Sequence, residues 1–403
     1  MKALYFDSDM KRIVLTKALS LVYRNAPLSR MSPVRYADVP EPGLPGDNWV
    51  KVKNRMCGLC GSDIHFMFLE IDPKTAPAAV PPIKRKFLGH ELVGEVVESG
   101  SGASEFVAGD RVILRIDWPS CYQKEARPMC RQCRRGNYLL CEDPGWDGAP
   151  DNQGGGFSPY MVVHKSQLVK IGPDIPDHDA ILIEPVACSV RAALKRPPVA
   201  GERVLVLGAG TIGLTMIMVL RAISPETEIW VLARYEHQAE AARRLGAFGV
   251  ISGKDAYRKV AEATAGRYFR GMFKNEMVIG GYDVIYDTVG NDRSITDALR
   301  WARAEGTVVV VGINFLPRRL DYTPIWYQEV TLVGIDCHGQ ETFRGASMTS
   351  FDAALALYRE GKLDFSGLVT HTFPMDDFRQ AVSIFFDKKG HKAVKVALVH
   401  PAG

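Results

Sequence analysis

The chain has 403 residues, 46% of them hydrophobic and 24% charged, which suits two or three packed domains and excludes a disordered chain or a small disulfide scaffold. Its 50 Lys and Arg residues against 46 Asp and Glu residues give a net charge of +4, which offers no case for a dedicated nucleic-acid or membrane-surface binder. Residues 1–15 lack the apolar core of a signal peptide, and no apolar run of about 18 residues follows. We therefore expect a cytoplasmic protein with no membrane span and no nucleic-acid partner.

The first part of the chain has the pattern of short strands. Val/Ile-rich or alternating segments, bounded by Gly, Pro or Asp, occupy residues 49–56, 91–98 and 109–116. They predict a mostly β domain. Residues 66–86 are rich in Pro and end in three basic residues, which favours one long surface loop, a solvated insertion rather than a lid over a neighbouring site.

The eight cysteines are unevenly spaced, and in a reducing compartment such clustering favours metal binding over disulfides. Within residues 119–145, Cys121 precedes the pattern Cys130-x2-Cys133-x7-Cys141. Four thiolates so close in sequence are typical of a closed tetrahedral zinc site that cross-links a loop. The stretch CRQCRRGNYLLC is too polar for its three cysteines to be merely buried small residues.

A second, dispersed set of metal-binding residue types lies in CGLCGSDIH at 57–65, GHE at 89–91 and LIEP at 182–185. One thiolate, one imidazole and one or two carboxylates would form an open zinc site of the catalytic type, with a position left for water or substrate. Two other interpretations stay open at this point, namely His90 as a structural histidine and Cys57 with Cys60 as a redox pair.

From about residue 200, apolar strands alternate with amphipathic helices, which predicts an α/β fold with a doubly wound parallel sheet. The expected strands are 203–207, 229–232, 248–251, 283–286, 307–311 and 330–334, with helices from Ile212, over 236–245 and around 295–303. Another helix begins near Thr349 or Ser350 and ends at Gly361. After a helix near 375–387, the strand at 395–399, like the one at 368–373, could return to the first domain.

The stretch RVLVLGAGTIGL places Gly208, Gly210 and Gly213 directly after a buried strand and at the start of a helix, as the G-x-G-x-x-G dinucleotide fingerprint requires. The first glycine allows the tight turn, the second lets the backbone approach a pyrophosphate, and the third allows the helix to pack closely on the strand. We expect a dinucleotide site here. Its further predicted members are Thr211, Ile212, Thr288 and Gly312.

The end of the second strand of this domain indicates which dinucleotide binds. An acidic residue there would accept hydrogen bonds from the ribose of NAD, but the sequence VLARYEHQ has Ala233 and then Arg234. An arginine can pair with a 2′-phosphate. The sequence therefore predicts NADP(H), with NAD(H) as the alternative if Arg234 is only a solvated surface residue.

These motifs follow one another in the order of a known family: CGLCGSDIH, GHELVGEVVESG, VAGDRV, the four-cysteine lobe, GGFSPYMVV, LIEP, VLVLGAGTIGL and KVALV. The chain resembles the zinc-dependent alcohol dehydrogenases of the medium-chain dehydrogenase/reductase superfamily, and among them the polyol, threonine and sugar dehydrogenases. The resemblance implies a GroES-like, β-rich catalytic domain over residues 1–188, with the zinc lobe at 119–145. A Rossmann domain would follow over 189–340, and residues 341–403 would return to the catalytic domain.

The resemblance also implies residue roles. Cys60 and His90 would bind a catalytic zinc ion, and Glu91 would be a ligand or lie against the metal. Glu184 would be a direct or water-bridged ligand, with Cys188, four residues further on, as its competitor.

Two further assignments follow from the same resemblance. Ser62 and His65 match the family's proton relay. A second, structural zinc would be bound by Cys121, Cys130, Cys133 and Cys141. The family's usual first position in this lobe holds Arg127 here, so a site with three ligands stays open.

The implied activity is hydride transfer between an alcohol (secondary, sugar, polyol or aromatic) and its carbonyl compound, in a homodimer or homotetramer with two zinc ions per chain. A zinc-independent quinone or enoyl reductase, or a non-catalytic cofactor-binding regulator, are the alternatives. Polyol enzymes often have a tyrosine where Phe66 stands, and IDCHGQ at 335–340 differs from their substrate segment. Phe66, Trp118 and Phe157 could instead line a pocket for a larger or aromatic alcohol.

Overall fold

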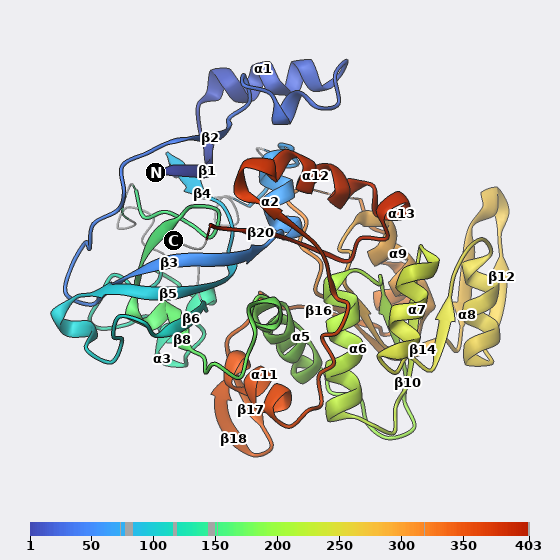
Figure 1. The fold of residues 1–403 in the computed structure, drawn as a ribbon. Helices are drawn as coiled ribbons and strands as arrows, with labels where there is room; N and C mark the ends of the chain where they lie inside the picture. Colours follow the sequence, from blue (N-terminus) through green and yellow to red (C-terminus); the bar gives the residue numbers. More distant parts are fainter. Residues whose placement is uncertain are drawn as a thin grey trace. The chain divides into compact units, whose positions relative to one another are not determined.

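The computed structural model describes residues 1–72, 74–76, 84–115, 119–143, 150, 152–317 and 319–401. The chain folds into two compact units. The first comprises residues 1–184, 315–317 and 369–403, and the second comprises 185–314 and 318–368 (Figure 1). Within the described ranges, no helix is long and apolar enough to span a bilayer.

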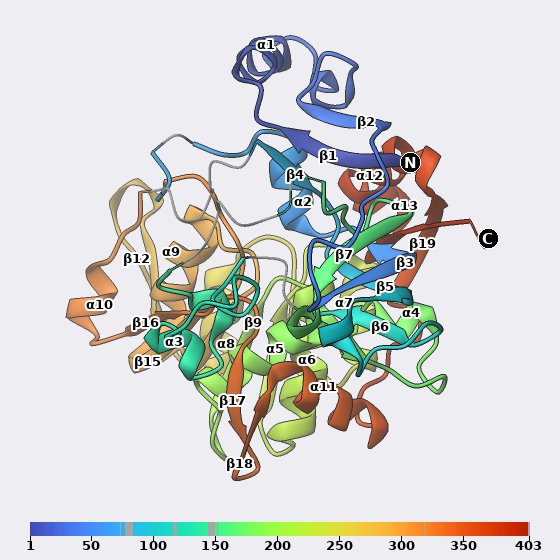
Figure 2. The ribbon, with the colours of Figure 1, turned by 90° about the vertical axis from the view of Figure 1, so that its left-hand side faces the viewer.

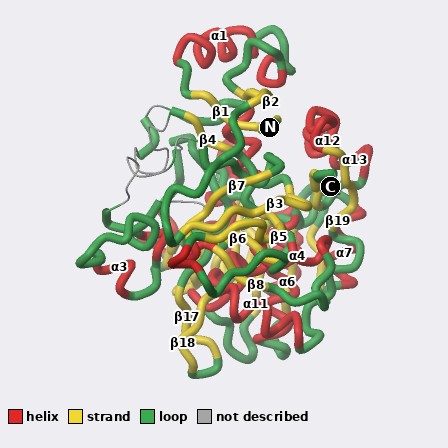
Figure 3. The backbone as a smooth tube through the Cα atoms, turned by 60° about the vertical axis from the view of Figure 1, so that its left-hand side comes forward, coloured by secondary structure: helices red, strands yellow, loops and turns green. Residues whose placement is uncertain are grey.

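The first unit is built on a seven-stranded sheet in which β3 is the central strand (Figure 3). One edge of β3 pairs with β5, and the other pairs with β7 along its first half and with β20 at its end, all antiparallel. The strands of this sheet are β19 (Val369–Pro374), β20 (Lys395–Val399), β3 (Trp49–Gly58), β5 (Glu91–Ser99), β6 (Arg111–Leu114), β8 (Leu168–Lys170) and β7 (Tyr160–His164). Strands β19 and β20, from the C-terminal end of the chain, both join this sheet.

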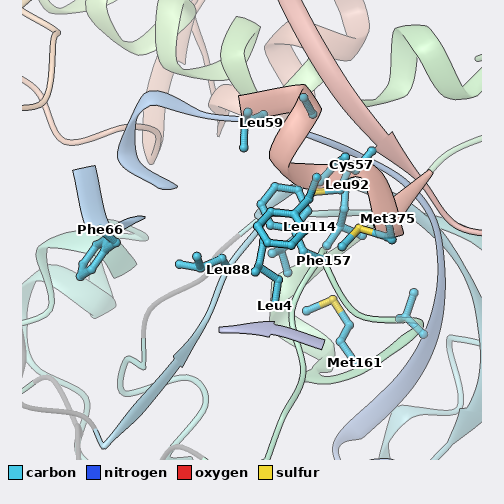
Figure 4. Close-up of a cluster of buried hydrophobic side chains, with 14 of the residues drawn as sticks. Leu4, Cys57, Leu59, Phe66, Leu88, Leu92, Leu114, Phe157, Met161 and Met375 are labelled. Carbon is cyan, nitrogen blue, oxygen red and sulfur yellow. The ribbon is translucent and has the colours of Figure 1, made fainter. Parts of the chain in front are cut away.

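A smaller sheet in the order β2-β1-β4 and several helices complete the unit. Its strands are β1 (Lys2–Asp7), β2 (Val34–Asp38) and β4 (Arg85–Phe87), and its helices are α1 (Met10–Ser20), α2 (Gly61–Met67), α3 (Arg131–Arg134), α4 (Asp177–Ala180), α12 (Phe378–Phe386) and α13 (Lys388–His391). Helix α5 (Ile183–Lys195) begins in this unit and continues into the second. Side chains from the large sheet, α2 and α12 form one apolar cluster, part of which Figure 4 shows.

The sequence predicted one long loop over residues 66–86, and this prediction is wrong at both ends. Helix α2 continues to Met67, where Phe66 and Met67 are buried in the apolar cluster, and β4 begins at Arg85. Residues 73 and 77–83 lie outside the described part of the chain. The basic residues at the end of the segment pack against aromatic rings, with the Arg85 guanidinium 4.8 Å from the Tyr5 ring centroid and the Lys86 ammonium 4.9 Å from that of Phe66.

The second unit contains the predicted doubly wound parallel sheet, in the order β11-β10-β9-β14-β15-β16. Numbered along the chain this order is 3-2-1-4-5-6, which is that of a dinucleotide-binding Rossmann sheet. Strands β9, β15 and β16 of this sheet are labelled in Figure 2. The strands are β9 (Arg203–Leu207), β10 (Glu228–Leu232), β11 (Gly249–Ile251), β14 (Tyr282–Asp287), β15 (Ala302–Val310) and β16 (Thr331–Gly334). The helices are α6 (Thr211–Ile223), α7 (Glu236–Arg244), α8 (Ala256–Thr264), α9 (Asp292–Trp301), α10 (Thr323–Tyr327) and α11 (Ser350–Arg359).

Two hairpins of this unit were not predicted: β12 (Arg267–Arg270) with β13 (Glu276–Ile279), and β17 (Gln340–Phe343) with β18 (Ala346–Thr349). The second hairpin runs directly into α11, whose cap is the Thr349 side chain, and Glu341 pairs with Arg191 of α5 at 2.7 Å. These contacts hold residues 341–368 in the second unit. The division therefore falls after 184 and after 368, whereas the predicted domain bounds were 188 and 340.

Candidate functional site

The dispersed metal-binding set comes together where β3 ends and β5 begins. Gly58 of β3 pairs with Glu91 of β5, so the turn after β3, which carries Cys60, meets the start of β5, which carries Glu91 directly after His90. A ligand atom from each of Cys60, His90 and Glu91 lies within 4.8 Å of the other two. We call these three residues the mixed cluster.

Asp63, which the sequence analysis missed as a site residue, joins the two segments of the mixed cluster. Its side chain is only 3% exposed and accepts hydrogen bonds from the backbone N–H of Cys60 (3.2 Å) and of Gly89 (3.0 Å). Burial raises the pKa of this carboxyl above its usual value. The sequence does contain a signal for this role. Cys60 precedes helix α2 and Asp63 follows Cys60 by three positions, which is the spacing of a capping box.

Lys395, the first residue of β20, lies against the mixed cluster and was also missed. Its ammonium forms an ion pair with Glu91, and both residues are 2% exposed. The ammonium also lies 3.4 Å from the carbonyl oxygen of Leu59. Burial alone would lower the pKa of Lys395, but the negative charges of Glu91 and Cys60 outweigh it, so this pKa lies above its ordinary value.

The two predicted relay residues both lie on α2 beside the mixed cluster, but no hydrogen bond joins them to each other in the described structure. The hydroxyl of Ser62 lies 3.5 Å from Nε2 of His90. The Nδ1 of His65 lies 2.6 Å from a carboxylate oxygen of Glu70, whose side chain is 45% exposed. Glu70 extends the line of polar groups from His65 towards solvent, and the sequence analysis did not single it out.

The remaining candidates for this centre take different positions. Glu184 lies in the first turn of α5 and is not a member of the mixed cluster, although its charge acts on Lys395. Cys188 belongs to the second unit. Cys57 is fully buried in the apolar cluster beside Leu92 and Phe157 (Figure 4), so it lies outside the cluster of ligand atoms and does not form a disulfide with Cys60.

All four lobe cysteines come together, Cys121 included. Their sulfur atoms lie within 4.8 Å of one another, with Cys121 to Cys141 at 3.7 Å and Cys130 to Cys141 at 3.9 Å. Burial raises the pKa of the Cys130 thiol, but the backbone N–H groups of Cys133 and Glu142 outweigh burial and lower this pKa to about 6. Each of these N–H groups donates to the sulfur at 3.4 Å.

The donor sets fit zinc. A tetrahedron with Zn–S bonds of about 2.3 Å has edges of about 3.8 Å, which agrees with the sulfur spacing of the lobe. The mixed cluster offers thiolate, imidazole and carboxylate donors, and three protein ligands are typical of a catalytic zinc with an open position. Metal binding itself displaces thiol protons, so the four cysteines need not be ionised in the free protein.

The glycine loop has the shape that a pyrophosphate site requires. Gly208 has φ +102°, which favours glycine, and a Cβ on Gly213 would overlap the carbonyl oxygen of Gly208. A Cβ on Gly210, by contrast, would meet nothing within 4 Å, so open space lies above the start of α6. Thr211 and Ile212 form the first turn of this helix, where backbone N–H groups favour an anion.

Two more predicted cofactor residues lie at the carboxyl ends of neighbouring strands. Thr288 follows β14, and its hydroxyl donates to the carbonyl of Leu207 at 2.9 Å. Gly312 follows β15, and a Cβ there would overlap the backbone at 289–290. The strand order reverses between β9 and β14, so the carboxyl ends of these strands lie at the point where such sheets bind ligands.

Arg234 lies two residues after β10 with its guanidinium exposed. It packs 5.4 Å from the ring centroid of Tyr235, and no carboxylate pairs with it in the described ranges. The preceding Ala233 is 2% exposed and cannot bind a ribose. Nothing acidic therefore stands where an NAD-preferring carboxylate would be expected.

Two of the three aromatic residues considered for a substrate pocket, Phe66 and Phe157, lie in the apolar core. Phe157 is fully buried and Phe66 is 6% exposed, and both belong to the apolar cluster of the first unit (Figure 4). Phe66 packs against Phe6 and Phe315 at ring-centroid distances of 5.9 and 5.6 Å. Trp118 lies outside the described residues.

Comparisons with known proteins agree with this architecture. Residues 46–174 match the model of the alcohol dehydrogenase GroES-like domain, and residues 211–352 match that of the zinc-binding dehydrogenases. The chain is 30% identical over 351 residues to L-idonate 5-dehydrogenase of Vitis vinifera, covering 86% of this chain and 87% of the relative. It is 28% identical over 362 residues to sorbitol dehydrogenase of Halalkalibacterium halodurans, covering 89% and 93%.

A solved structure has the same fold. The structure of an alcohol dehydrogenase from Escherichia coli CFT073 in complex with NADH aligns with a TM-score of 0.72 at 23% identity, covering 99% of each chain. With its GroES-like and Rossmann units and its two donor clusters, the chain belongs to the zinc-dependent alcohol dehydrogenase family of the medium-chain dehydrogenase/reductase superfamily. It is an oxidoreductase of the polyol and threonine dehydrogenase branch.

Proposed function

We propose that this enzyme oxidises an alcohol, or reduces its carbonyl compound, with NADP(H) at a zinc ion bound by the mixed cluster. The observation that carries the proposal is the proximity of thiolate, imidazole and carboxylate ligand atoms, all within 4.8 Å of one another. A zinc-independent reductase would have no need of this donor set. The second zinc is assigned to Cys121, Cys130, Cys133 and Cys141.

Each residue of the centre has a distinct part in the mechanism. Cys60 and His90 would hold the metal, Glu91 would bind it or lie against it, and Glu184 would approach it directly or through water. A zinc ion held there would supply Lewis acidity that makes a substrate hydroxyl easier to deprotonate, and a bound nicotinamide cofactor would supply the hydride chemistry. Asp63 holds the segments that carry Cys60 and His90 in place.

The proton released from the substrate hydroxyl must reach water. Ser62 can accept and donate a proton through one hydroxyl, and His65 can accept a proton on one ring nitrogen and donate one from the other. Because no hydrogen bond joins these two side chains in the described structure, transfer between them requires a bridging hydroxyl or water. Glu70, hydrogen-bonded to His65 and 45% exposed, would then accept the proton at the surface.

The substrate is assigned only by class. Sorbitol and L-idonate dehydrogenases among the relatives favour a polyol or sugar-like secondary alcohol, whereas the burial of Phe66 and Phe157 removes the support for a pocket built from these two rings. For the cofactor, the exposed Arg234 and the absence of an acidic residue beside it favour NADP(H).

The cysteines and the edge of the Rossmann sheet bear on the cellular compartment and the oligomeric state of the enzyme. None of the eight cysteines forms a disulfide in the described structure, although the sulfurs of Cys121 and Cys141 lie only 3.7 Å apart, which favours a reducing compartment such as the cytoplasm. Strand β16 ends the Rossmann sheet with Leu332 37% exposed, which favours a homodimer or homotetramer through this edge.

Zinc content and turnover test the proposal together. We expect two zinc atoms per chain in the native enzyme, one in Cys60→Ser and one in Cys141→Ser, with NADP⁺-dependent oxidation of alcohols lost in Cys60→Ser. The assay uses a panel of polyols, sugars, amino alcohols and aromatic alcohols, followed by nicotinamide absorbance. A native enzyme with a single zinc atom that Cys60→Ser retains would overturn the catalytic assignment.

A further inference from the structure

A cavity of about 660 Å³ opens in the first unit, and none of the residues of the mixed cluster lines it. Its walls are the segment 23–29 between α1 and β2, Phe68 after the end of α2, and residues 379–387 of α12 and its C-terminal end. Small-molecule sites typically have volumes of about 300–1,000 Å³, so the cavity can hold a compact organic ligand.

One wall of the cavity is aromatic. Phe68 and Phe386 meet edge to face with ring centroids 4.6 Å apart, and Phe386 remains 40% exposed. Arg379, Val382, Ser383 and Phe386 repeat with the spacing of one helix face. A planar apolar group could therefore pack against rings that are already fixed by each other.

The residues that line the cavity carry more positive than negative charge. The Nε of Arg379 donates to the carbonyl of Leu28 at 3.0 Å, and the Arg24 guanidinium lies 5.9 Å from the Phe386 ring centroid. In the described part of the chain, no carboxylate pairs with either arginine. The one acidic residue of the lining, Asp387, is engaged by the backbone N–H of Gly390 at 3.0 Å.

We propose that this cavity is an accessory binding site for a small aromatic anion. Its carboxylate, or another planar or tetrahedral anionic head, would bind Arg24 and Arg379, and its ring would lie against Phe68 and Phe386. A guanidinium group binds such heads through paired N–H donors, and both arginines have donors to spare. A cation would be repelled, and a neutral ring would leave two arginines without a counter-charge.

The test uses the full-length, zinc-loaded enzyme and a fluorinated naphthoate, with its neutral amide as the matched probe, followed by fluorine NMR line broadening. We expect saturable binding of the naphthoate at least about tenfold tighter than that of the amide. Arg24→Met, which removes a side chain that forms no hydrogen bond with the described residues, should weaken naphthoate binding about tenfold. Arg379→Met should do the same, and Arg379→Lys should restore part of the affinity.

Two controls separate this site from others. Arg359→Met removes an exposed arginine of α11, outside the cavity, and should leave the affinity unchanged. Because a carboxylate could also bind zinc, Cys60→Ser serves as the second control and should likewise leave it unchanged. Equal binding of naphthoate and amide, no saturable binding, or a loss confined to Cys60→Ser would each overturn the proposal.

Discussion

Lys395 and Glu91 form an ion pair in the interior of the first unit, although 304 positions separate them along the chain. Both residues are 2% exposed, so bulk water hydrates neither charge. Each charge is therefore stabilised mainly by the opposite charge of its partner. The pair also links β20, from the C-terminal end of the chain, to the start of β5, where the candidate zinc ligands stand.

Loss of the lysine should leave a buried, unpaired carboxylate. We expect Lys395→Met to lower the free energy of unfolding by about 3–5 kcal/mol, measured by urea denaturation, and Lys395→Met with Glu91→Gln to recover part of this loss. The control is Arg243→Ala, which breaks an exposed pair with Glu236 and should cost less than about 1 kcal/mol. Equal effects of Lys395→Met and Arg243→Ala would contradict this account.

The glycine loop allows a separation of folding from cofactor binding. Gly213→Ala should destabilise the enzyme by about 1–3 kcal/mol, because its Cβ would overlap the Gly208 carbonyl. Gly210→Ala meets open space, so its stability should stay close to that of the native enzyme. If a pyrophosphate occupies that space, Gly210→Ala should weaken NADPH binding at least about tenfold in a fluorescence titration. Unchanged binding would rule out this placement of the cofactor.

The preference for NADP(H) should depend on Arg234. In Arg234→Asp the new carboxylate repels a 2′-phosphate and can accept hydrogen bonds from a ribose, so the ratio of kcat/KM for NADPH over NADH should fall about 10- to 100-fold. Arg359→Asp makes the same charge change on α11 and should leave the ratio as it is. If Arg234→Asp also leaves the ratio of kcat/KM unchanged, Arg234 is a solvated surface residue with no part in cofactor choice.

Acid stability should report on Asp177 of α4. Burial by itself raises its pKa, but hydrogen bonds from Arg55 of β3 (2.8 Å) and Arg111 of β6 (2.6 Å) outweigh burial, and its pKa lies below the ordinary 3.8. A carboxyl whose pKa is lowered in the folded state contributes stability above its unfolded pKa, and this contribution disappears as the pH falls through the folded value.

Asp177→Asn should therefore be less stable than the native enzyme by about 1.5–3 kcal/mol at neutral pH. The difference should narrow as the pH falls below about 4, because the carboxyl of the unfolded chain takes up a proton near its ordinary pKa while the folded carboxyl stays ionised to lower pH. Urea denaturation between pH 3 and pH 7 measures both quantities. A difference that does not depend on pH would show that Asp177 acts through its shape alone.

Local patterns were sufficient for much of the fold. The strand at 203–207 and the glycine loop follow from the apolar run and the spacing of Gly208, Gly210 and Gly213, since these interactions are short in sequence. The hairpin of β12 and β13 was missed because RYFR and EMVI lack a two-residue turn signal between them. In the same way, no local pattern indicates that Asp63 accepts a hydrogen bond from Gly89 or that Glu70 contacts His65.

The sequence by itself determined the α/β architecture and pointed to the two sets of candidate metal ligands and the glycine loop, because periodicity and spacing within short segments carry that information. Only the tertiary structure decided that Lys395 neutralises Glu91, that Cys121 joins the other three lobe cysteines, that Cys57 stays in the apolar core, and that Arg24 and Arg379 face one cavity. Burial and pairing across hundreds of residues depend on how β20, β3 and β5 align in one sheet, and no local pattern specifies that alignment.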